Sequence, residues 1–300
     1  MKILLLGKNG QVGHELQRTL LPLGEVVALG HQDVNLEDIA HLERTLNAHA
    51  PGIIVNAAAY TAVDKAESDE VTAHKVNADA VGLMADYAKK NNALLVHYST
   101  DYVYDGEKRG AYTEADITNP QSAYGRTKLA GEQAVLQSGC HSLIFRTSWV
   151  FSAHGSNFIK TIMRLAMERD NLGIVADQVG APTSAELIAD VTGLAIAAHK
   201  QKNAIAHGIY HLAASGEASW YEFAKHIIIK LGKNGAALKL NGAHIRPIAT
   251  DEYPLPAKRP KNSRLDTGKL SVALGLEIPH WTNYADRTID QLTNRNSNEA

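Results

Sequence analysis

Residues 2–16, KILLLGKNGQVGHEL, decide the fold, because an apolar run passes through a glycine-rich turn into a helical pattern. Such a strand-turn-helix needs glycine where the chain turns sharply, where backbone approaches a pyrophosphate, and where helix packs on strand. Gly7, Gly10 and Gly13 fit these needs, and phosphates would meet free N–H groups at the helix N-terminus. A turn that only needs flexible residues would show the same spacing. Its place directly after a strand that starts at residue 2 favours a dinucleotide site.

The end of the second predicted strand leaves the cofactor preference open. An Asp or Glu there usually binds the ribose hydroxyls of NAD, but the chain has Gly30, His31 and Gln32. No Arg or Lys stands there to favour the extra phosphate of NADP. We predict that His31, Asp33 and Val34 contact the cofactor, with Asp33 on the adenine side, and that the cofactor is NADH or NADPH.

The composition favours small-molecule chemistry in a globular protein. The 300 residues are 45% hydrophobic and carry a formal net charge of −2 without long runs of one sign, which excludes an electrostatic footprint for nucleic acid or an anionic membrane. The single cysteine, Cys140, predicts a reducing, cytoplasmic location. No apolar stretch approaches the roughly 18 residues that span a bilayer, and the N-terminus resembles a signal peptide only for its first six residues.

Short apolar runs alternate with helical patterns through the first half of the chain, which predicts an α/β fold with a Rossmann-type, doubly wound parallel sheet. The candidate strands are residues 2–6, 26–29, 53–56, 94–99 and 143–147, and helices are predicted over 36–48 and 74–91. Beyond residue 150 the pattern becomes less regular. We predict an NAD(P)-binding domain of residues 1–150 plus roughly 172–200, and a smaller substrate lobe of roughly 151–171 plus 201–300.

The segment SAYGRTKLAGE, residues 122–132, places Tyr124 and Lys128 four positions apart. On a helix that starts near residue 123 both side chains share one face. The strand before them ends at Thr100, and ligands of a doubly wound sheet lie at the carboxyl ends of its strands. Reduction of a carbonyl needs a proton donor, and a phenol with a pKa of about 10 suits this role better beside a cation. An ammonium about 4 Å away would lower that pKa by up to roughly three units.

Two other pairs have the same spacing. Gly106 lies between Tyr104 and Lys108, so that pair is predicted in a loop, and the helix of Tyr221 and Lys225 follows no strand end. Position in the fold, and not spacing, therefore selects Tyr124, Lys128 and Thr100 as the catalytic candidates.

Six blocks of sequence, spread over most of the chain, resemble those of a known family. They are NAAAYTAVDKAE (56–67), HYSTDYVYDG (97–106), YGRTKLAGE (124–132), FRTSWVF (145–151), DQVGAPT (177–183) and RPKNSRLD (259–266). Together with the glycine turn they resemble the dTDP-4-dehydrorhamnose reductase family of the extended short-chain dehydrogenases/reductases. The resemblance implies NAD(P)H-dependent reduction of the C4 ketone of dTDP-4-dehydro-L-rhamnose, for bacterial surface polysaccharide.

The resemblance also implies roles for residues at the matching positions. Tyr124 would donate the proton, Lys128 would support it and hold the nicotinamide ribose, and Thr100 would bind the carbonyl oxygen. The pyrophosphate and the cofactor cleft would be formed by Gly10, Gln11, Val12, Ala59, Tyr60, Thr61 and Tyr98. Asp101 and Trp149 would touch the sugar nucleotide, although Trp149 could instead pack in the core. Arg259 would either meet the diphosphate or brace the second lobe.

Two alternatives concern the reaction. Related 4,6-dehydratases place an Asp-Glu pair straight after the threonine, whereas this chain has Asp101 and Tyr102, which favours simple reduction. A catalytically silent relative, such as the regulatory subunit of methionine adenosyltransferase, or another sugar-nucleotide reductase or epimerase, is the competing interpretation.

A metal site is the last expectation. Glu186 and Asp190, four apart on a predicted helix, could with Glu15 present carboxylates to Mg²⁺ between the subunits of a homodimer. Thr183 and Glu186 also match a capping box, which needs no metal.

Overall fold

The large sheet of the protein is parallel throughout. The computed structural model describes residues 1–201, 205–240 and 244–298. The six strands of the large sheet follow the order β10-β5-β4-β3-β1-β2. Their bounds are β1 Lys2–Leu6, β2 Glu25–Leu29, β3 Ile53–Asn56, β4 Leu94–Thr100, β5 His141–Thr147 and β10 Gly208–His211.

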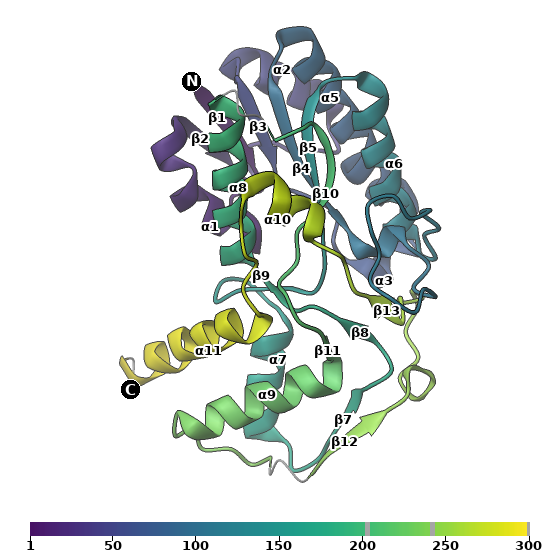
Figure 1. Ribbon diagram of the computed structural model, residues 1–300, viewed down its shortest axis with the longest axis vertical. Coiled ribbons are helices and arrows are strands. Elements are labelled where there is room, and N and C mark those ends of the chain that lie inside the picture. Colours follow the sequence, from purple (N-terminus) through teal and green to yellow (C-terminus); the bar gives the residue numbers. More distant parts are fainter. Residues whose placement is uncertain (202–204, 241–243, 299–300) are drawn as a thin grey trace.

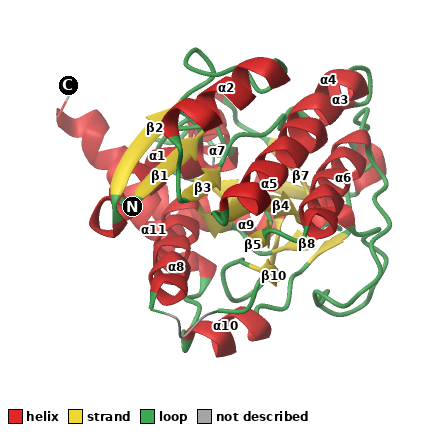
Figure 2. Ribbon diagram, turned by 90° about the horizontal axis from the view of Figure 1, so that it is seen from above, coloured by secondary structure: helices red, strands yellow, loops and turns green. Residues whose placement is uncertain are grey.

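Helices cover both faces of this sheet (Figures 1 and 2). On one face α1, Gln11–Thr19, packs with α8, Ala185–Lys200, and on the other lie α2, Ile39–His49, α5, Ala80–Asn91, and α6, Ala123–Ser138. Neighbouring residues along β1 alternate between the two cores, since Ile3 and Leu5 belong to the first and Leu4 and Leu6 to the second. This double burial explains why the strands read as continuous apolar runs, and the predicted doubly wound fold is confirmed.

A smaller lobe lies beyond the carboxyl ends of the large sheet (Figure 1). It has short sheets of β7 Leu172–Val175 with β12 Ile245–Ile248, and of β8 Val179–Gly180 between β11 Ala218–Ser219 and β13 Asn262–Ser263. A further two-stranded pair joins β6 Val150–Phe151 to β9 Thr183–Ser184. The long helices here are α7 Phe158–Glu168, α9 Trp220–Lys233 and α11 Trp281–Asn298, while the short α10, Gly268–Leu274, packs on β10 and α8.

Several predicted boundaries were wrong. Residues 208–211 were assigned to the second lobe but form the edge strand β10, because Ile209 and Tyr210 pair in register with Ile144 and Phe145. Conversely, β7 was assigned to the first lobe but pairs with β12. The helix predicted over 36–48 begins at Ile39, because the carboxylate of Asp38 accepts from the N–H of His41 and so caps the helix.

A buried polar network ties α6 to β5. Arg146 donates from Nε and Nη2 to the two carboxylate oxygens of Glu132, at 2.9 and 2.5 Å, and from Nη1 to the Tyr104 hydroxyl at 2.6 Å. The Tyr104 hydroxyl also lies 2.8 Å from His211 Nε2. Both members of the ion pair are buried, so the network satisfies charges that water cannot reach.

The buried His211 should make the folding stability of the protein fall at acid pH. Burial, with the nearby charge of Arg146, lowers the pKa of His211 to about 3. Below the unfolded value of about 6.5 the unfolded chain binds a proton that the folded chain refuses, so stability falls as the pH drops toward 3. We expect His211 to contribute about 1.4 kcal/mol per pH unit to this slope. Urea unfolding at pH 7, 6 and 5 should show a shallower slope for His211→Asn than for the wild type, and equal slopes would contradict the assignment.

Candidate functional site

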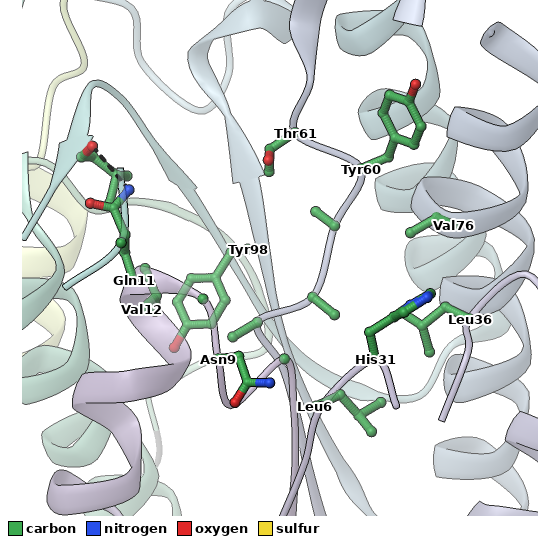
Figure 3. Close-up of a pocket in the computed structure, with 18 of the residues that line it drawn as sticks. Leu6, Asn9, Gln11, Val12, His31, Leu36, Tyr60, Thr61, Val76 and Tyr98 are labelled. Atoms are coloured by element: carbon green, nitrogen blue, oxygen red, sulfur yellow. Dashed lines mark hydrogen bonds between the residues drawn. The ribbon is translucent and has the colours of Figure 1, made fainter. Parts of the chain in front are cut away.

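A cavity of about 620 Å³ opens at the carboxyl ends of β1, β3 and β4. Gln11, Val12 and Tyr98 lie on one side of it, and His31, Leu36 and Val76 on the other (Figure 3). The structure brings twelve of the predicted residues to its wall, namely Gly7, Gly10, Gln11, Val12, His31, Val34, Ala59, Tyr60, Thr61, Tyr98, Tyr124 and Lys128.

The glycine turn is held by close backbone contacts. Gly7 has a φ of +86°, and a Cβ on it would lie 2.7 Å from the nitrogen of Ala58. A Cβ on Gly13 would lie 2.0 Å from the carbonyl oxygen of Gly7, so Gly13 permits helix-strand packing and does not line the cavity. Gly10 is the N-cap of α1, which has no side-chain cap, and this leaves first-turn N–H groups available to an anion.

Asp33 has hydrogen-bond partners within the chain, and its contact with the cofactor stays a prediction. Its carboxylate accepts from the N–H of Gly30 at 2.8 Å and from Lys8 Nζ at 2.7 Å, and these contacts lower the pKa of Asp33. Asp33 therefore closes the turn after β2 and does not line the cavity. The positions that the sequence reasoning missed at this end are Asn9, Asn35, Leu36, Glu37 and Val76. Two of them carry a sequence signal, because Asn9 and Asn35 are next to the predicted residues Gly10 and Val34.

Tyr124 and Lys128 sit in the first two turns of α6, which starts where the Ser122 hydroxyl accepts from the N–H of Gly125. Burial and the negative charge of Asp101 raise the pKa of Tyr124 to about 12, while a hydrogen bond with Thr100 opposes the shift. The Thr100 hydroxyl donates to Asp101 at 2.9 Å. The phenol of Tyr124 is therefore in its proton-donating form throughout the neutral range.

Lys128 is almost fully buried, with 2% of its surface exposed. Its Nζ donates to the carbonyl oxygen of Tyr98 at 2.6 Å, and burial lowers its pKa to about 8. The sequence predicted that Lys128 lowers the pKa of Tyr124, but the net shift of that pKa in this structure is upward. The reason is that desolvation of the phenol and the charge of Asp101 act in the opposite direction.

Thr100 and Asp101 are buried beside Tyr124 and line neither this cavity nor the second one, which is described next. Desolvation raises the pKa of Asp101 to about 6, and the neighbouring Ser263 and Thr100 hydroxyls oppose the shift. Asp101 thus lies at the end of β4 near Ser263 of β13, in the second lobe.

A second cavity of about 810 Å³ lies in the smaller lobe and is lined by Arg259, Trp220, Phe158 and Gln178, among others. Arg259 donates to both carboxylate oxygens of Asp64, at 2.9 and 2.7 Å, and so bridges α3, Val63–Ala66, to the second lobe. Trp149 does not line either cavity. Trp149 is half-buried, and the centroid of its ring lies 3.6 Å from that of Trp220, which lines the second cavity. Its φ of +50° indicates a backbone held by its surroundings.

The two decoy pairs lie elsewhere. Tyr104 is part of the buried network around Arg146, and Lys108 pairs with Asp116. Tyr221 and Lys225 form a cation–π contact on α9 and line neither cavity.

The predicted Mg²⁺ site is not formed within one chain. Across residues 1–201, 205–240 and 244–298, no group of three or more His, Cys, Asp or Glu side chains could hold a metal ion. Glu186 accepts from Arg287 and Gln291, and Asp190 accepts from Arg18. Burial and the charges of Glu186 and Asp190 raise the pKa of Glu15. The three carboxylates are thus near one another, but two of them already have cationic or amide partners.

Among the residues that the structure describes, we find no helix with the length and apolarity that a membrane crossing requires.

Comparisons with known proteins identify the family of this chain. The family model described as RmlD substrate binding domain matches residues 1–294. A dTDP-4-dehydrorhamnose reductase of Burkholderia thailandensis is 48% identical over 94% of this chain and 95% of its own, and one of Escherichia coli K12 is 46% identical over 97% and 98%.

Solved structures are similar over the same length. A dTDP-4-dehydrorhamnose reductase of Clostridium acetobutylicum has a TM-score of 0.89 at 38% identity, and one of Bacillus anthracis, in complex with NADP, has 0.87 at 32%. Each comparison covers 97% of this chain and 99% of the other. A matching family model, curated relatives near half identity and solved structures over almost the full length agree that this chain belongs to the dTDP-4-dehydrorhamnose reductase family.

Proposed function

We propose that the protein is an NAD(P)H-dependent oxidoreductase that reduces the C4 ketone of dTDP-4-dehydro-L-rhamnose to dTDP-L-rhamnose. The observation that carries this proposal is the placement of Tyr124 and Lys128 on one face of α6, in a cavity at the strand ends and beside Thr100. Curated relatives with this name at 46–48% identity support the substrate assignment.

The residues of this chain would have the following roles in the reaction. The first cavity takes NADPH or NADH, with the pyrophosphate at the N-terminus of α1, and the bound nicotinamide supplies the hydride. Tyr124 gives its proton to the oxygen at C4, and the charge on Lys128 stabilises the phenolate that forms. Thr100 would turn its hydroxyl from Asp101 to the ketone oxygen.

The sugar nucleotide belongs, on this proposal, in the second cavity. Trp220 and Phe158 offer aromatic surface there, and the guanidinium of Arg259 offers charge for a diphosphate. The large sheet with α8 would then be the cofactor domain, and the smaller lobe would be the substrate domain. Arg259 connects the two through its ion pair with Asp64, and Asp101 lies near Ser263 of the smaller lobe.

Consumption of NADPH by the purified protein with dTDP-4-dehydro-L-rhamnose tests the proposal. Turnover with this substrate supports it, and turnover only with another nucleotide sugar would replace the substrate. No turnover with NADPH or NADH, together with retained nucleotide binding, would favour the silent regulatory relative instead.

Gly10 and Gly13 allow cofactor binding to be separated from folding. In Gly10→Ala the new Cβ lies 3.4 Å from the nearest atom, so we expect an unfolding free energy within about 0.5 kcal/mol of the wild type, but at least roughly tenfold weaker NADPH binding, because the methyl group faces the pyrophosphate. In Gly13→Ala the Cβ meets the Gly7 oxygen, and we expect a loss of about 1–3 kcal/mol.

Urea unfolding and titration with NADPH check both variants. Wild-type affinity in Gly10→Ala would mean that the pyrophosphate does not approach α1.

The homodimer, the Mg²⁺ between its subunits and the cytoplasmic location stay predictions. Glu15, Glu186 and Asp190 gather around α1 and α8, so a second subunit on this face could complete the carboxylate set.

A further inference from the structure

A chain of buried polar groups leads from β3 through β4 to Lys128. Asn56 Nδ2 lies 3.2 Å from His97 Nδ1, and His97 Nε2 lies 3.4 Å from Lys128 Nζ. Asn56 and Lys128 are 1–2% exposed and His97 is fully buried. Burial therefore limits the hydrogen-bond partners of Asn56 and His97 to one another, to Lys128 and to neighbouring backbone groups.

The hydrogen count fixes the form of His97. The N–H of Ala58 donates to Asn56 Oδ1 at 3.2 Å, which leaves the NH₂ of the amide to face His97 Nδ1. Nδ1 must then accept, and a neutral imidazole carries its proton on Nε2, which faces Lys128. Burial and the charge of Lys128 lower the pKa of His97 well below its ordinary value, so the ring is neutral.

This arrangement opposes a charge on Lys128. An ammonium has only donors, so Lys128 as a cation meets the Nε2–H donor of His97, whereas the neutral amine can accept from it. The Nζ keeps its bond to the carbonyl of Tyr98 in either form. The long distance of 3.4 Å to His97 fits two donors in poor contact.

Other groups around Lys128 do not cancel this effect. Glu132, one turn further on α6, favours the charged form, but its two oxygens are bound by Arg146. Tyr98 directs its hydroxyl to Thr192. Ionisable groups on the elements packed against α6 include the buried Asp101 and the half-buried Tyr102 after β4. They also include the exposed His74, Lys75, Asp79 and Asp86, Glu70, which pairs with Arg126, and Asp64, which pairs with Arg259. Tyr124 lies on α6 itself.

We propose that His97, held by Asn56 in the form with its proton on Nε2, is a positioning residue that sets the pH range over which Lys128 is charged. The effect on Lys128 is independent of the reductase activity, but its effect on turnover rests on the proposed function. Reduction would fail on the alkaline side once Lys128 loses its charge, because nothing then stabilises the phenolate of Tyr124.

Asn56→Asp reverses the arrangement without touching Lys128. A carboxylate accepts from Nδ1–H, so the His97 proton moves to Nδ1 and the Nε2 lone pair faces the ammonium. We expect the titration of Lys128, followed by the ¹³Cε shift of labelled lysine and assigned with Lys128→Arg, to rise by roughly one to two pH units, the effect of gaining a hydrogen bond to a charged group. Ring ¹⁵N shifts of His97 should change from the Nε2–H to the Nδ1–H form.

His97→Gln distinguishes an effect of Asn56→Asp that passes through the His97 hydrogen bonds from the direct electrostatic effect of the new carboxylate on Lys128. A glutamine can turn its carbonyl oxygen to the ammonium, so Lys128 should again titrate higher, and adding Asn56→Asp to this variant should shift it less than in the wild type. An equal shift in both backgrounds would mean that the aspartate acts through space alone, and would overturn the role of His97. The control variant His211→Gln, which replaces another fully buried histidine, should leave the titration of Lys128 unchanged.

The alkaline limb of the kcat/KM profile should move with the Lys128 titration. Wild-type His97 in the Nδ1–H form, or a Lys128 titration that neither variant moves, would overturn the inference. Because both NMR measurements use the protein without substrate, loss of the proposed function would be seen separately, as absent NADPH consumption.

Discussion

Tyr124→Phe should lower kcat by roughly 10²- to 10⁴-fold, the usual loss when a general acid is removed. The phenyl ring keeps the packing against Tyr102, whose ring lies 5.5 Å away, but it has no proton to give. NADPH affinity should stay within about threefold of the wild type, since the cavity wall loses one hydroxyl and no charge. Initial rates under saturating substrate, with NADPH binding followed by fluorescence, measure both quantities.

Tyr221→Phe is the matched control. Tyr221 has the same spacing to a lysine, Lys225, on a helix, but it lines neither cavity. We expect wild-type kcat for this variant. If Tyr124→Phe kept its rate, or if both variants lost activity equally, Tyr124 would not be the proton donor.

Glu132→Ala should destabilise the protein by about 3–5 kcal/mol, because it leaves the buried guanidinium of Arg146 without its counter-ion. The remaining partner of Arg146, the Tyr104 hydroxyl, is neutral and cannot offset that charge. Urea unfolding at pH 7 measures the loss, with an unchanged m-value as the check that the denatured state is the same.

An exposed pair offers the comparison. Arg164 and Glu168 form the same type of ion pair, Arg with Glu, on the surface of α7. Glu168→Ala removes the partner of Arg164 and should lower the free energy of unfolding by about 0.3–0.5 kcal/mol. Replacing Glu132 and Arg146 together by leucine and methionine should recover most of the loss, since no charge is then left unpaired. A small effect of Glu132→Ala alone would mean that water reaches Arg146.

Local patterns in the sequence determined the sheet and the position of the catalytic helix. Apolar runs buried on both faces define β1, β3, β4 and β5, and Ser122 marks the start of α6 within one residue. The glycine turn could also be predicted from the sequence. Gly7 and Gly13 meet steric demands that arise largely within one strand-turn-helix unit. Tyr124 and Lys128 followed from helical periodicity, which depends only on separation along the chain.

Contacts between distant segments were decided only by the tertiary structure. The strand β10 has only two apolar residues, Ile209 and Tyr210, and its pairing with β5 shows that it is a strand, while the carboxylate of Asp33 binds Lys8 and Gly30. The pKa of Tyr124 depends on burial and on Asp101, and the charge of Lys128 on His97 and Asn56. The sequence by itself determined which side chains face the cavity from α6, because local geometry sets them; only the tertiary structure decided their proton affinities, because desolvation and hydrogen bonds come from segments far apart in the chain.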